Sequence, residues 1–260
     1  MLRSPVWISL LARVAFGAAA AGALVVAHAA DRYDAAVQHA GRSAADLQRD
    51  ALDQPAAMLR LAGLRPGQRV LDMLAGDGYY SELASYVVGP QGHVLLLNDP
   101  SFERWSADAL PARVANGRLP NVEHRVAPFD QLALGERAFD AILLIKVYHD
   151  LYWVDSDKKN WPTVPTAAVL DAIVRALKPG GVLLLVDHSA KPGTGSGAAS
   201  NLHRIDEAFA QHDFTSRGLK LVAKSDALRK PEDPREQISY KPPMLGKTDR
   251  FVLVFRRKGS

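Results

Sequence analysis

Apolar residues make up 48% of the 260-residue chain, which is enough to build the core of one large domain or two small ones. The formal net charge is +4 without a basic run or an arginine-rich stripe, so nucleic acid is not an expected partner. Cysteine is absent, which excludes disulfides, a nucleophilic thiol and any thiolate metal site.

The N-terminal segment 1–30 has the layout of a secretory signal peptide. Basic residues come first, an uncharged run covers 14–27, and the AHA motif at 27–29 places small residues at the spacing that signal peptidase recognises. The run is short for a membrane-spanning helix, although an uncleaved anchor is the alternative. We expect cleavage near residue 30, which predicts a periplasmic or secreted protein without stable membrane insertion after cleavage.

From about residue 69 onward, apolar runs alternate with helix-compatible segments. Runs such as VLLLND, FDAILLIKV and GVLLLVD are continuous, which is typical of strands buried on both faces of a mainly parallel sheet. The alternation predicts a doubly wound, Rossmann-like α/β fold with helices on both faces of the sheet. The predicted strands cover 69–74, 93–98, 122–127, 138–146, 181–187, 219–224 and 250–257, and the predicted helices cover 79–88, 103–115 and 164–177.

The segments at the two ends of the sheet differ from this pattern. Residues 31–68 contain one short helical pattern, QPAAMLRLAGLRPG, and we interpret them as a helical N-terminal cap of a single domain that spans 31–260. The connection to the last strand, 250–257, is rich in proline and charge and shows no crossover helix. That connection predicts an antiparallel last strand.

The segment VLDMLAGDGYYSE, at 70–82, is predicted to be a buried strand followed by a glycine turn and a helix. Glycine lets the backbone approach a ligand, and the start of the following helix offers free N–H groups. Asp72, Gly76, Asp77 and Gly78 are therefore candidate cofactor-binding residues. A tight turn that needs glycine for its own geometry is the alternative interpretation.

Polar residues also follow the next two predicted strands. Asn98 and Asp99 end the second strand, where an oxygen acceptor would reach ribose hydroxyls. Asp130 follows the third strand, in a place that suits the edge of an adenine. A helix cap for Asn98 or Asp99 and an Asx turn for Asp130 are the structural alternatives.

Histidines follow the fourth and fifth strands. His149 and Asp150 come directly before LYW, which suggests a partly buried pocket with aromatic walls, and a histidine there can transfer protons near neutral pH. The alternative is a histidine that only caps the strand end. His188 follows the apolar run LLLVD of the fifth strand.

A third histidine, His203, lies in LHRIDEAF with Asp206 and Glu207. On a helix, residue 203 would face both of these carboxylates. His149, His188 and His203 could then meet on one rim of the sheet, as a metal site, an acid/base cluster or plain helix surface. Because the chain lacks cysteine and a short paired-histidine motif, no metal is predicted.

Three longer segments, in this order along the chain, resemble a class I S-adenosylmethionine-dependent methyltransferase: RPGQRVLDMLAGDGYYSELASYV, FDAILLIKVYHDLYW and LKPGGVLLLVDHSA. Four shorter segments, HDLYW, DHSA, HRIDE and GKTDRFVL, are similar to those of an exported bacterial group of predicted methyltransferases. The resemblance covers about residues 33–257. It implies a seven-stranded sheet with an antiparallel last strand, and S-adenosylmethionine as the cofactor.

The resemblance also implies roles for the candidate residues. It places Asp72, Gly76 and Gly78 against the methionine part of the cofactor, Asn98 or Asp99 at the ribose and Asp130 near the adenine. The segment Tyr148-His149-Asp150 would face the reacting methyl group. The usual first turn reads acidic-x-Gly-x-Gly-x-Gly, and in this chain Leu74 stands where the first of these glycines is expected.

Together these features predict methyl transfer from S-adenosylmethionine to a small-molecule acceptor. The predicted general base is His149, oriented by Asp150, with His188 as the second candidate. The predicted substrate pocket contains Tyr79, Tyr80, Tyr148, Tyr152, Trp153, His203 and Asp206. Two other functions remain open, namely a periplasmic binding or sensing protein without catalysis, and a metal-assisted enzyme that uses His149, His188, His203 and Asp206. The sequence does not indicate an oligomeric state.

Overall fold

The computed structural model describes Met1 and residues 31–156 and 159–259. All of the predicted signal peptide except Met1 therefore lies outside the described residues. Among the residues that are described, no helix is both long enough and apolar enough to cross a membrane.

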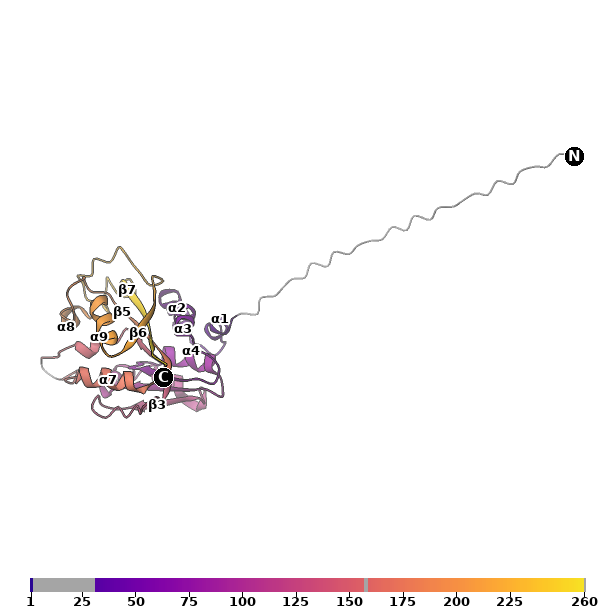
Figure 1. Ribbon diagram of the computed structural model, residues 1–260, viewed down its shortest axis with the longest axis horizontal. Coiled ribbons are helices and arrows are strands. Elements are labelled where there is room, and N and C mark those ends of the chain that lie inside the picture. The colour runs from indigo at the N-terminus through magenta and orange to yellow at the C-terminus, as the bar shows by residue number, and fades with distance from the viewer. Residues whose placement is uncertain (2–30, 157–158, 260) are drawn as a thin grey trace.

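A seven-stranded sheet forms the centre of the described chain, in the order β3-β2-β1-β4-β5-β7-β6 (Figure 1). Strands β1 to β5 pair in parallel, whereas β7 runs antiparallel to both β5 and β6, so the predicted orientation of the last strand is confirmed. The bounds are β1 Arg69–Met73, β2 His93–Asn98, β3 Val122–Val126, β4 Phe139–Ile145, β5 Leu177–His188, β6 Leu219–Ser225 and β7 Arg250–Arg257.

The strand order reverses between β1 and β4, because β2 and β3 lie to one side of β1 and the later strands lie to the other. This reversal is the topological switch point at which open α/β sheets bind ligands, beyond the carboxyl ends of the strands. Residues that follow β1, β2 and β4 therefore meet on one rim of the sheet.

The predicted strand ends agree with the observed ones to within one residue, except at the start of β5. This strand begins at Leu177 instead of residue 181, because Leu177 already pairs with Phe139 before a shift in register. The helix predicted at 164–177 correspondingly ends at Ala176.

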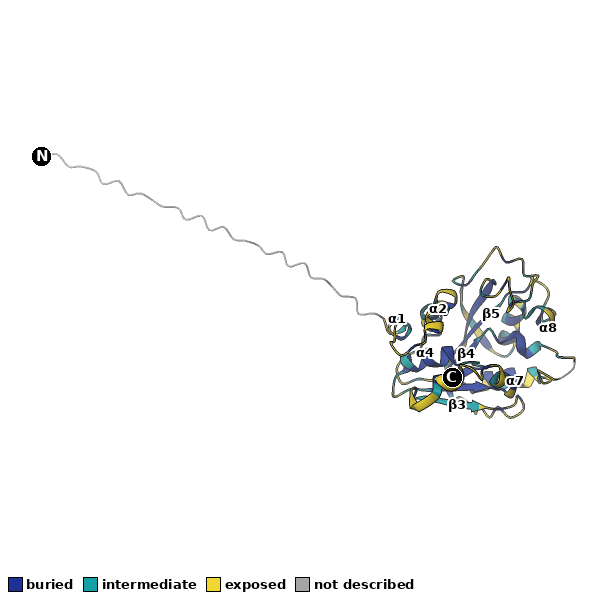
Figure 2. Cartoon of the chain, turned by 180° about the vertical axis from the view of Figure 1, so that it is seen from behind, coloured by how far each residue is buried: buried dark blue, intermediate teal, exposed yellow. Residues whose placement is uncertain are grey.

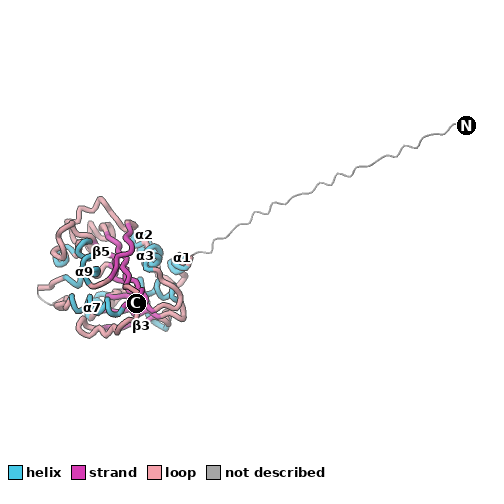
Figure 3. Tube along the Cα trace, viewed as in Figure 1, coloured by secondary structure: helices cyan, strands magenta, loops and turns pink. Residues whose placement is uncertain are grey.

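Helices cover both faces of the sheet, as Figure 3 shows. On one face, α3 (Pro55–Ala62) and α4 (Tyr79–Val88) bury an apolar cluster that includes Val70 of β1. On the other face, α7 (Thr166–Ala176) and α9 (Glu207–Ser216) bury a second cluster that includes Leu71. Neighbouring residues of one strand thus enter different cores, which explains the continuous apolar strands and the buried centre in Figure 2.

Residues 31–68 contain three helices, where the sequence predicted one short helix. In addition to α3, the segment forms α1 (Arg32–Val37) and α2 (Ala44–Asp53). The side chains of Asp31 and Ser43 accept hydrogen bonds from first-turn amides and cap these two helices. These N-cap residues are the sequence signal that could have revealed both helices.

The helix predicted at 103–115 is divided in two. Asp99 caps α5 (Pro100–Trp105), and α6 (Leu110–Val114) follows as a separate helix with a short 3-10 turn, η1 (Ala115–Gly117), behind it. The break places Ser106 beside the turn that follows β1, since Ser106 Oγ lies near Gly76.

The helix predicted across LHRIDEAF is also interrupted. Helix α8 (Ala199–Leu202) ends at His203, which has a left-handed backbone with a φ of +49°, and Asp206 is the N-cap of α9. The expectation that His203 and Asp206 share one helix face was therefore wrong.

Candidate active site

The turn after β1 contains three left-handed residues, since Leu74, Gly76 and Gly78 have φ angles of +53°, +59° and +78°. A leucine in this conformation costs about 1–2 kcal/mol of backbone energy. Its side chain is 2% exposed and belongs to the same apolar cluster as Met73 and Leu97, and such burial stabilises by about 1.5–3 kcal/mol. Leu74 therefore keeps the backbone conformation of a glycine while its side chain joins the core.

Asn98, the last residue of β2, holds this turn. Its buried side chain accepts a hydrogen bond from Gly76 N (2.9 Å) and donates one to Gly76 O (2.9 Å). The second hydrogen of its amide group points to Glu103 (3.2 Å). The structure thus assigns Asn98 to the turn, and the predicted ribose contact of Asn98 is not supported.

Asp72 lies beneath the turn rather than on a ligand-accessible surface. It is 3% exposed and accepts a hydrogen bond from Ser81 Oγ (2.6 Å), and burial raises the pKa of Asp72 to about 7. Asp77 accepts a hydrogen bond from Tyr79 N (3.2 Å), and its carboxylate lies 3.6 Å from both Arg49 and Arg113. Both carboxylates therefore organise the turn and its neighbours.

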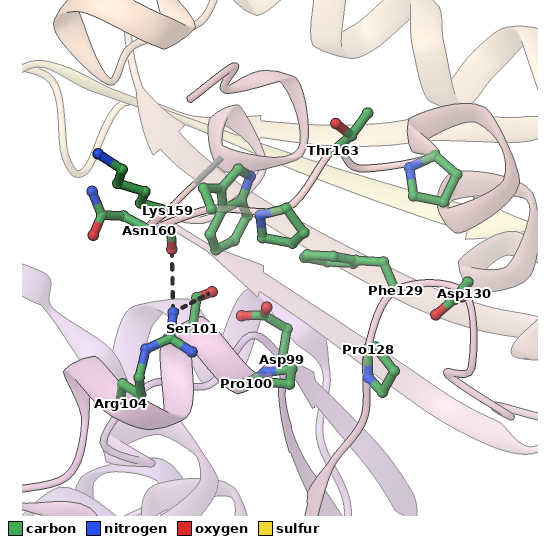
Figure 4. Close-up of a pocket in the computed structure, with 13 residues that line it drawn as sticks. Asp99, Pro100, Ser101, Arg104, Pro128, Phe129, Asp130, Lys159, Asn160 and Thr163 are labelled. Atoms are coloured by element: carbon green, nitrogen blue, oxygen red, sulfur yellow. Dashed lines mark hydrogen bonds between the residues drawn. The ribbon is translucent and has the colours of Figure 1, made fainter. Parts of the chain in front are cut away.

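A cavity of about 540 Å³, which we call the Asp99 cavity, lies beyond the carboxyl ends of β2 and β3. Asp99, Phe129 and Asp130 line it, as Figure 4 shows. Trp161 lines it as well, and its Nε1 is buried without a hydrogen-bond partner among the described residues. The cavity therefore combines flat apolar walls with two carboxylates and one unsatisfied donor.

A second cavity of about 550 Å³, the aromatic cavity, adjoins the first, and Asn160 lines both. Its walls are aromatic, and Asp150 and His203 form its polar edge. The ring of Trp105 stacks on that of Trp161, with centroids 5.6 Å apart and an interplanar angle of 6°. The aromatic residues that line this cavity are Phe102, Trp105, Trp153 and Tyr240.

A third cavity of about 560 Å³, the basic cavity, shares Tyr240 with the aromatic cavity. Lys146, which follows β4, and His188, the last residue of β5, line it together with Arg49 of α2 and Arg250 of β7. The three cavities thus form a chain of neighbours along the rim of the sheet.

His149 is buried between two carboxylates in a 3-10 turn, η2 (His149–Tyr152). Its Nδ1 lies 2.7 Å from Asp187 Oδ1, and its Nε2 lies 3.2 Å from Asp150 Oδ1. Burial alone would lower the pKa of His149, but the charges of Asp150 and Asp187 outweigh burial and raise it to about 10. A protonated imidazole cannot accept a proton at neutral pH, so this geometry contradicts the predicted role of His149 as general base.

His188 has the opposite electrostatic environment. Burial lowers the pKa of His188 well below its ordinary value, and the positive charges of His149 and Lys146 lower it further. Its Nδ1 lies 2.7 Å from Thr248 Oγ1, and its ring faces that of His149 with centroids 5.9 Å apart. His188 is therefore neutral at neutral pH and lines a cavity, so it can accept a proton, although its lowered pKa makes it a weak base.

No family model matches the chain. Two curated relatives bear the name ubiquinone/menaquinone biosynthesis C-methyltransferase UbiE. The protein from Vibrio campbellii is 31% identical over 169 residues, which are 65% of this chain and 57% of the relative. The protein from Vibrio parahaemolyticus is 32% identical over 163 residues, which are 62% and 54% of the two chains. The chain thus spans little more than half the length of these relatives.

Solved structures share the overall fold of this chain. A methyltransferase from Aquifex aeolicus, described as S-adenosylmethionine-dependent, has a TM-score of 0.57 at 18% identity, over 80% of this chain and 92% of its own. The chain therefore shares the fold of this methyltransferase. The fold also resembles SpnF, described as a [4+2]-cyclase, with a TM-score of 0.54 at 16% identity, over 86% of each chain.

Compared with the acidic-x-Gly-x-Gly-x-Gly motif that the resemblance implies, the first turn differs in composition but keeps the expected backbone conformation. Leu74 adopts the left-handed conformation that the expected glycine would supply. Asp99 takes the position at the end of β2 that faces a cavity, because Asn98 is turned inward onto Gly76. Asp99 and Asp130, predicted at the ribose and the adenine, thus line one cavity, whereas Asp72 and Gly78 do not line it.

The histidine cluster differs from the set of His149, His188, His203 and Asp206 that the metal-assisted alternative would use. Asp206 accepts hydrogen bonds from Gly193 N (2.6 Å) and Ala208 N (2.9 Å) and serves as a helix cap, so its predicted place in the substrate pocket was wrong. Among the described residues, ligand atoms of His149, Asp150 and His203 lie within 4.8 Å of one another. Asp150 lies within ion-pair distance of both of these histidines, so the group is held together by its own contacts.

Most of the tyrosines predicted for the substrate pocket have structural contacts instead. Tyr79 and Tyr80 are buried, and their hydroxyls bond to Asp50 (2.5 Å) and to the carbonyl of Asp53 (3.3 Å) in the N-terminal cap. The hydroxyls of Tyr148 and Tyr152 both donate to Asp213 of α9. Of the predicted aromatic residues, Trp153 is the one that lines the aromatic cavity.

Sequence reasoning missed the residues that complete the three cavities. Trp105 ends helix α5, Trp161 lies in the loop before α7, and Tyr240 lies in the proline-rich connection before β7. Lys146 directly follows β4, and its left-handed φ of +62° marks it as an unusual position. Tryptophans outside the predicted strands are the signal that could have indicated the first two.

Proposed function

We propose that the protein binds S-adenosylmethionine and transfers its methyl group to a small, flat acceptor. The observation that carries the proposal is the Asp99 cavity, at the end of β2 and β3, in a chain with this fold and these relatives. A nucleoside needs flat apolar walls and hydroxyl acceptors, and Phe129, Asp99 and Asp130 supply both kinds of group.

The unsatisfied donor in this cavity supports the same ligand class. Trp161 Nε1 is buried and lacks a partner among the described residues, and leaving such a group unpaired costs about 1–3 kcal/mol. A nitrogen or oxygen atom of a bound nucleoside would accept a hydrogen bond from Trp161 Nε1. The residues present therefore fit the cofactor, with Asp99, Phe129, Asp130 and Trp161 as those that would hold it.

When bound, the cofactor would supply a methyl group on a positively charged sulfur. The rings of Trp105 and Trp153 in the adjoining aromatic cavity can stabilise a cation over their faces. The walls of the aromatic cavity would align a flat acceptor, and neutral His188, in the wall of the neighbouring basic cavity, would accept its proton. The names of the relatives, C-methyltransferases of quinone biosynthesis, agree with an aromatic acceptor.

Titration calorimetry with S-adenosylmethionine tests the proposal. We expect Trp161→Phe, which keeps a ring and removes the Nε1 donor, to weaken binding about 5- to 10-fold. Asp99→Asn keeps an N-cap side chain for α5 while removing the carboxylate, and should also weaken binding. Lys178→Met serves as the control. It removes the ion pair between Lys178 and Asp140, and neither residue lines the Asp99 cavity. Absence of binding to the unmodified protein would contradict the proposal.

We also propose that the protein is exported through its signal sequence at 1–30. The support is the basic start, the short uncharged run and the small residues at 27–29. N-terminal sequencing of the protein recovered from the periplasmic fraction should give a chain that begins near residue 30. Recovery of the uncleaved chain in the cytoplasm would contradict export.

A further inference from the structure

The basic cavity holds three cationic side chains around one carboxylate. Asp53 accepts hydrogen bonds from Arg49 Nε (2.7 Å), Lys146 Nζ (2.8 Å) and Arg250 Nη1, and its own side chain is 5% exposed. Burial raises the pKa of Asp53, but the three cations outweigh it and lower the pKa below its ordinary value. Asp53 is therefore ionised, and it neutralises one of the three positive charges.

The neighbouring groups leave this positive charge largely uncompensated. Asp77 approaches Arg49 to 3.6 Å, but it is shared with Arg113 and does not line the cavity. His188, which does line the cavity, is neutral at neutral pH because burial lowers its pKa. Arg250 is buried, whereas the side chains of Arg49 and Lys146 are 30% and 24% exposed. A cavity of about 560 Å³ with this excess of positive charge is complementary to an anion.

A separate observation indicates a ligand in the same place. Ser239 lines the basic cavity and is 2% exposed, yet its hydroxyl has no hydrogen-bond partner among the described residues. Native proteins pair nearly all such groups, and an orphaned hydroxyl on a cavity wall fits a missing acceptor. Lys146 adds a third sign, because its left-handed backbone, with a φ of +62°, is strained for a residue with a side chain.

We propose that the basic cavity binds the anionic group, a carboxylate or an oxyanion of similar size, of the methyl acceptor. Tyr240 lines both this cavity and the aromatic cavity, so one molecule can place its ring in the aromatic cavity and its charge in the basic cavity. Arg49, Lys146 and Arg250 supply the positive charge, and Ser239 donates a hydrogen bond. The assignment to the acceptor rests on the proposed function, whereas anion binding by the cavity does not.

A matched pair of probes tests the charge preference. Benzoate and benzamide have nearly the same shape and differ in charge, and their affinities are measured by calorimetry in a chloride-free buffer. We expect benzoate to bind at least about tenfold more tightly than benzamide, and Lys146→Met to abolish that preference. Lys146→Arg should retain the preference for benzoate. Lys178→Met is the control, because Lys178 pairs with Asp140 at the opposite, amino-terminal end of the strands. Equal affinities in the unmodified protein would overturn the proposal.

A second variant and a second ligand separate the remaining outcomes. Ser239→Ala removes only a hydroxyl, so it tests the site even if Lys146→Met lowers the melting temperature. It should weaken the binding of benzoate several-fold and leave the binding of benzamide unchanged. S-adenosylmethionine also carries a carboxylate. If Lys146→Met weakened the binding of S-adenosylmethionine as much as that of benzoate, the anionic group bound in the cavity would be that of the cofactor. The assignment to the acceptor would then be wrong. If the protein bound benzoate but no S-adenosylmethionine, the proposed function would fail while the anion site stood.

Discussion

At the scale of single residues, Gly76 and Gly78 of the first turn differ in their surroundings. A Cβ at Gly78 would lie 2.6 Å from Leu96 Cδ1 and 3.1 Å from Arg113 Cδ. A Cβ at Gly76 would have Ser106 Oγ at 3.7 Å, which is an ordinary contact. Both residues have positive φ, so a side chain at either one strains the backbone, but at Gly78 it also overpacks the core.

This difference predicts unequal effects of two similar substitutions. Gly78→Ala should lower the free energy of unfolding by about 2–4 kcal/mol, the sum of backbone strain and overpacking. Gly76→Ala should lower it by about 1–2 kcal/mol from strain alone. Urea unfolding of both variants checks this, and equal losses would show that Leu96 and Arg113 move aside at little cost.

At the scale of secondary structure, the η2 turn after β4 is tied to the end of β5 through His149 and Asp187. Asp187 accepts a hydrogen bond from His149 N (2.8 Å) and also contacts the imidazole ring of His149. One carboxylate thus holds both the backbone and the side chain of His149. Because the folded pKa of His149 is raised to about 10, the folded protein binds this proton more tightly than the unfolded chain does. The stabilisation is complete below the unfolded pKa near 6.5 and is lost as the pH rises toward about 10.

His149 should therefore contribute about 3 kcal/mol less to the free energy of unfolding at pH 9 than at pH 6.5. His149→Asn removes the titrating group, so the gap in unfolding free energy between this variant and the unmodified protein should narrow by that amount over the same range. His212→Asn, at an exposed position of α9, is the control and should show no such change. A gap that stays constant with pH would mean that His149 is not protonated in the folded protein.

At the scale of the whole molecule, a buried ion network joins the N-terminal cap to the sheet domain. Arg113, 7% exposed, donates to Asp46 of α2 (2.8 Å), to the carbonyl of Asp77 (2.6 Å) in the glycine turn and to Glu82 of α4. On the far side of the cap, Arg250 of β7 binds Asp53 at the end of α2. The cap therefore closes over both the first turn and the basic cavity through charged contacts.

Arg113→Leu should lower the free energy of unfolding by about 3–5 kcal/mol, because it leaves buried carboxylates without their partner. Arg60→Leu breaks an exposed pair with Asp31 (2.7 Å) and should cost less than about 1 kcal/mol. Chemical denaturation of both variants tests the comparison. Similar losses would mean that the cap is held mainly by apolar packing.

Much of the fold could be predicted because its signals are local. Both faces of the central strands are buried, so the runs in β2, β4 and β5 had to be continuously apolar, and their bounds were predicted to within one residue except at the start of β5. The same logic placed Asp99 and Asp130 at strand ends, which meet on one rim in any parallel sheet. The antiparallel last strand followed from the missing crossover helix in the connection before it.

The sequence by itself thus determined the order of the seven strands, the rim of the sheet along which the cavities lie and two of the residues that line the Asp99 cavity. Only the tertiary structure decided that Asn98 turns inward while Asp99 faces a cavity. It also reversed the order of the two candidates for general base, because His149 is protonated and His188 is neutral. The charges around His149 and the burial of His188 come from strands and loops far apart in the chain. The basic cavity has the same origin, since Asp53 gathers its cations from α2, β4 and β7. Periodicity reports which face of an element is buried, whereas a pKa or a cavity depends on which distant groups are packed against it.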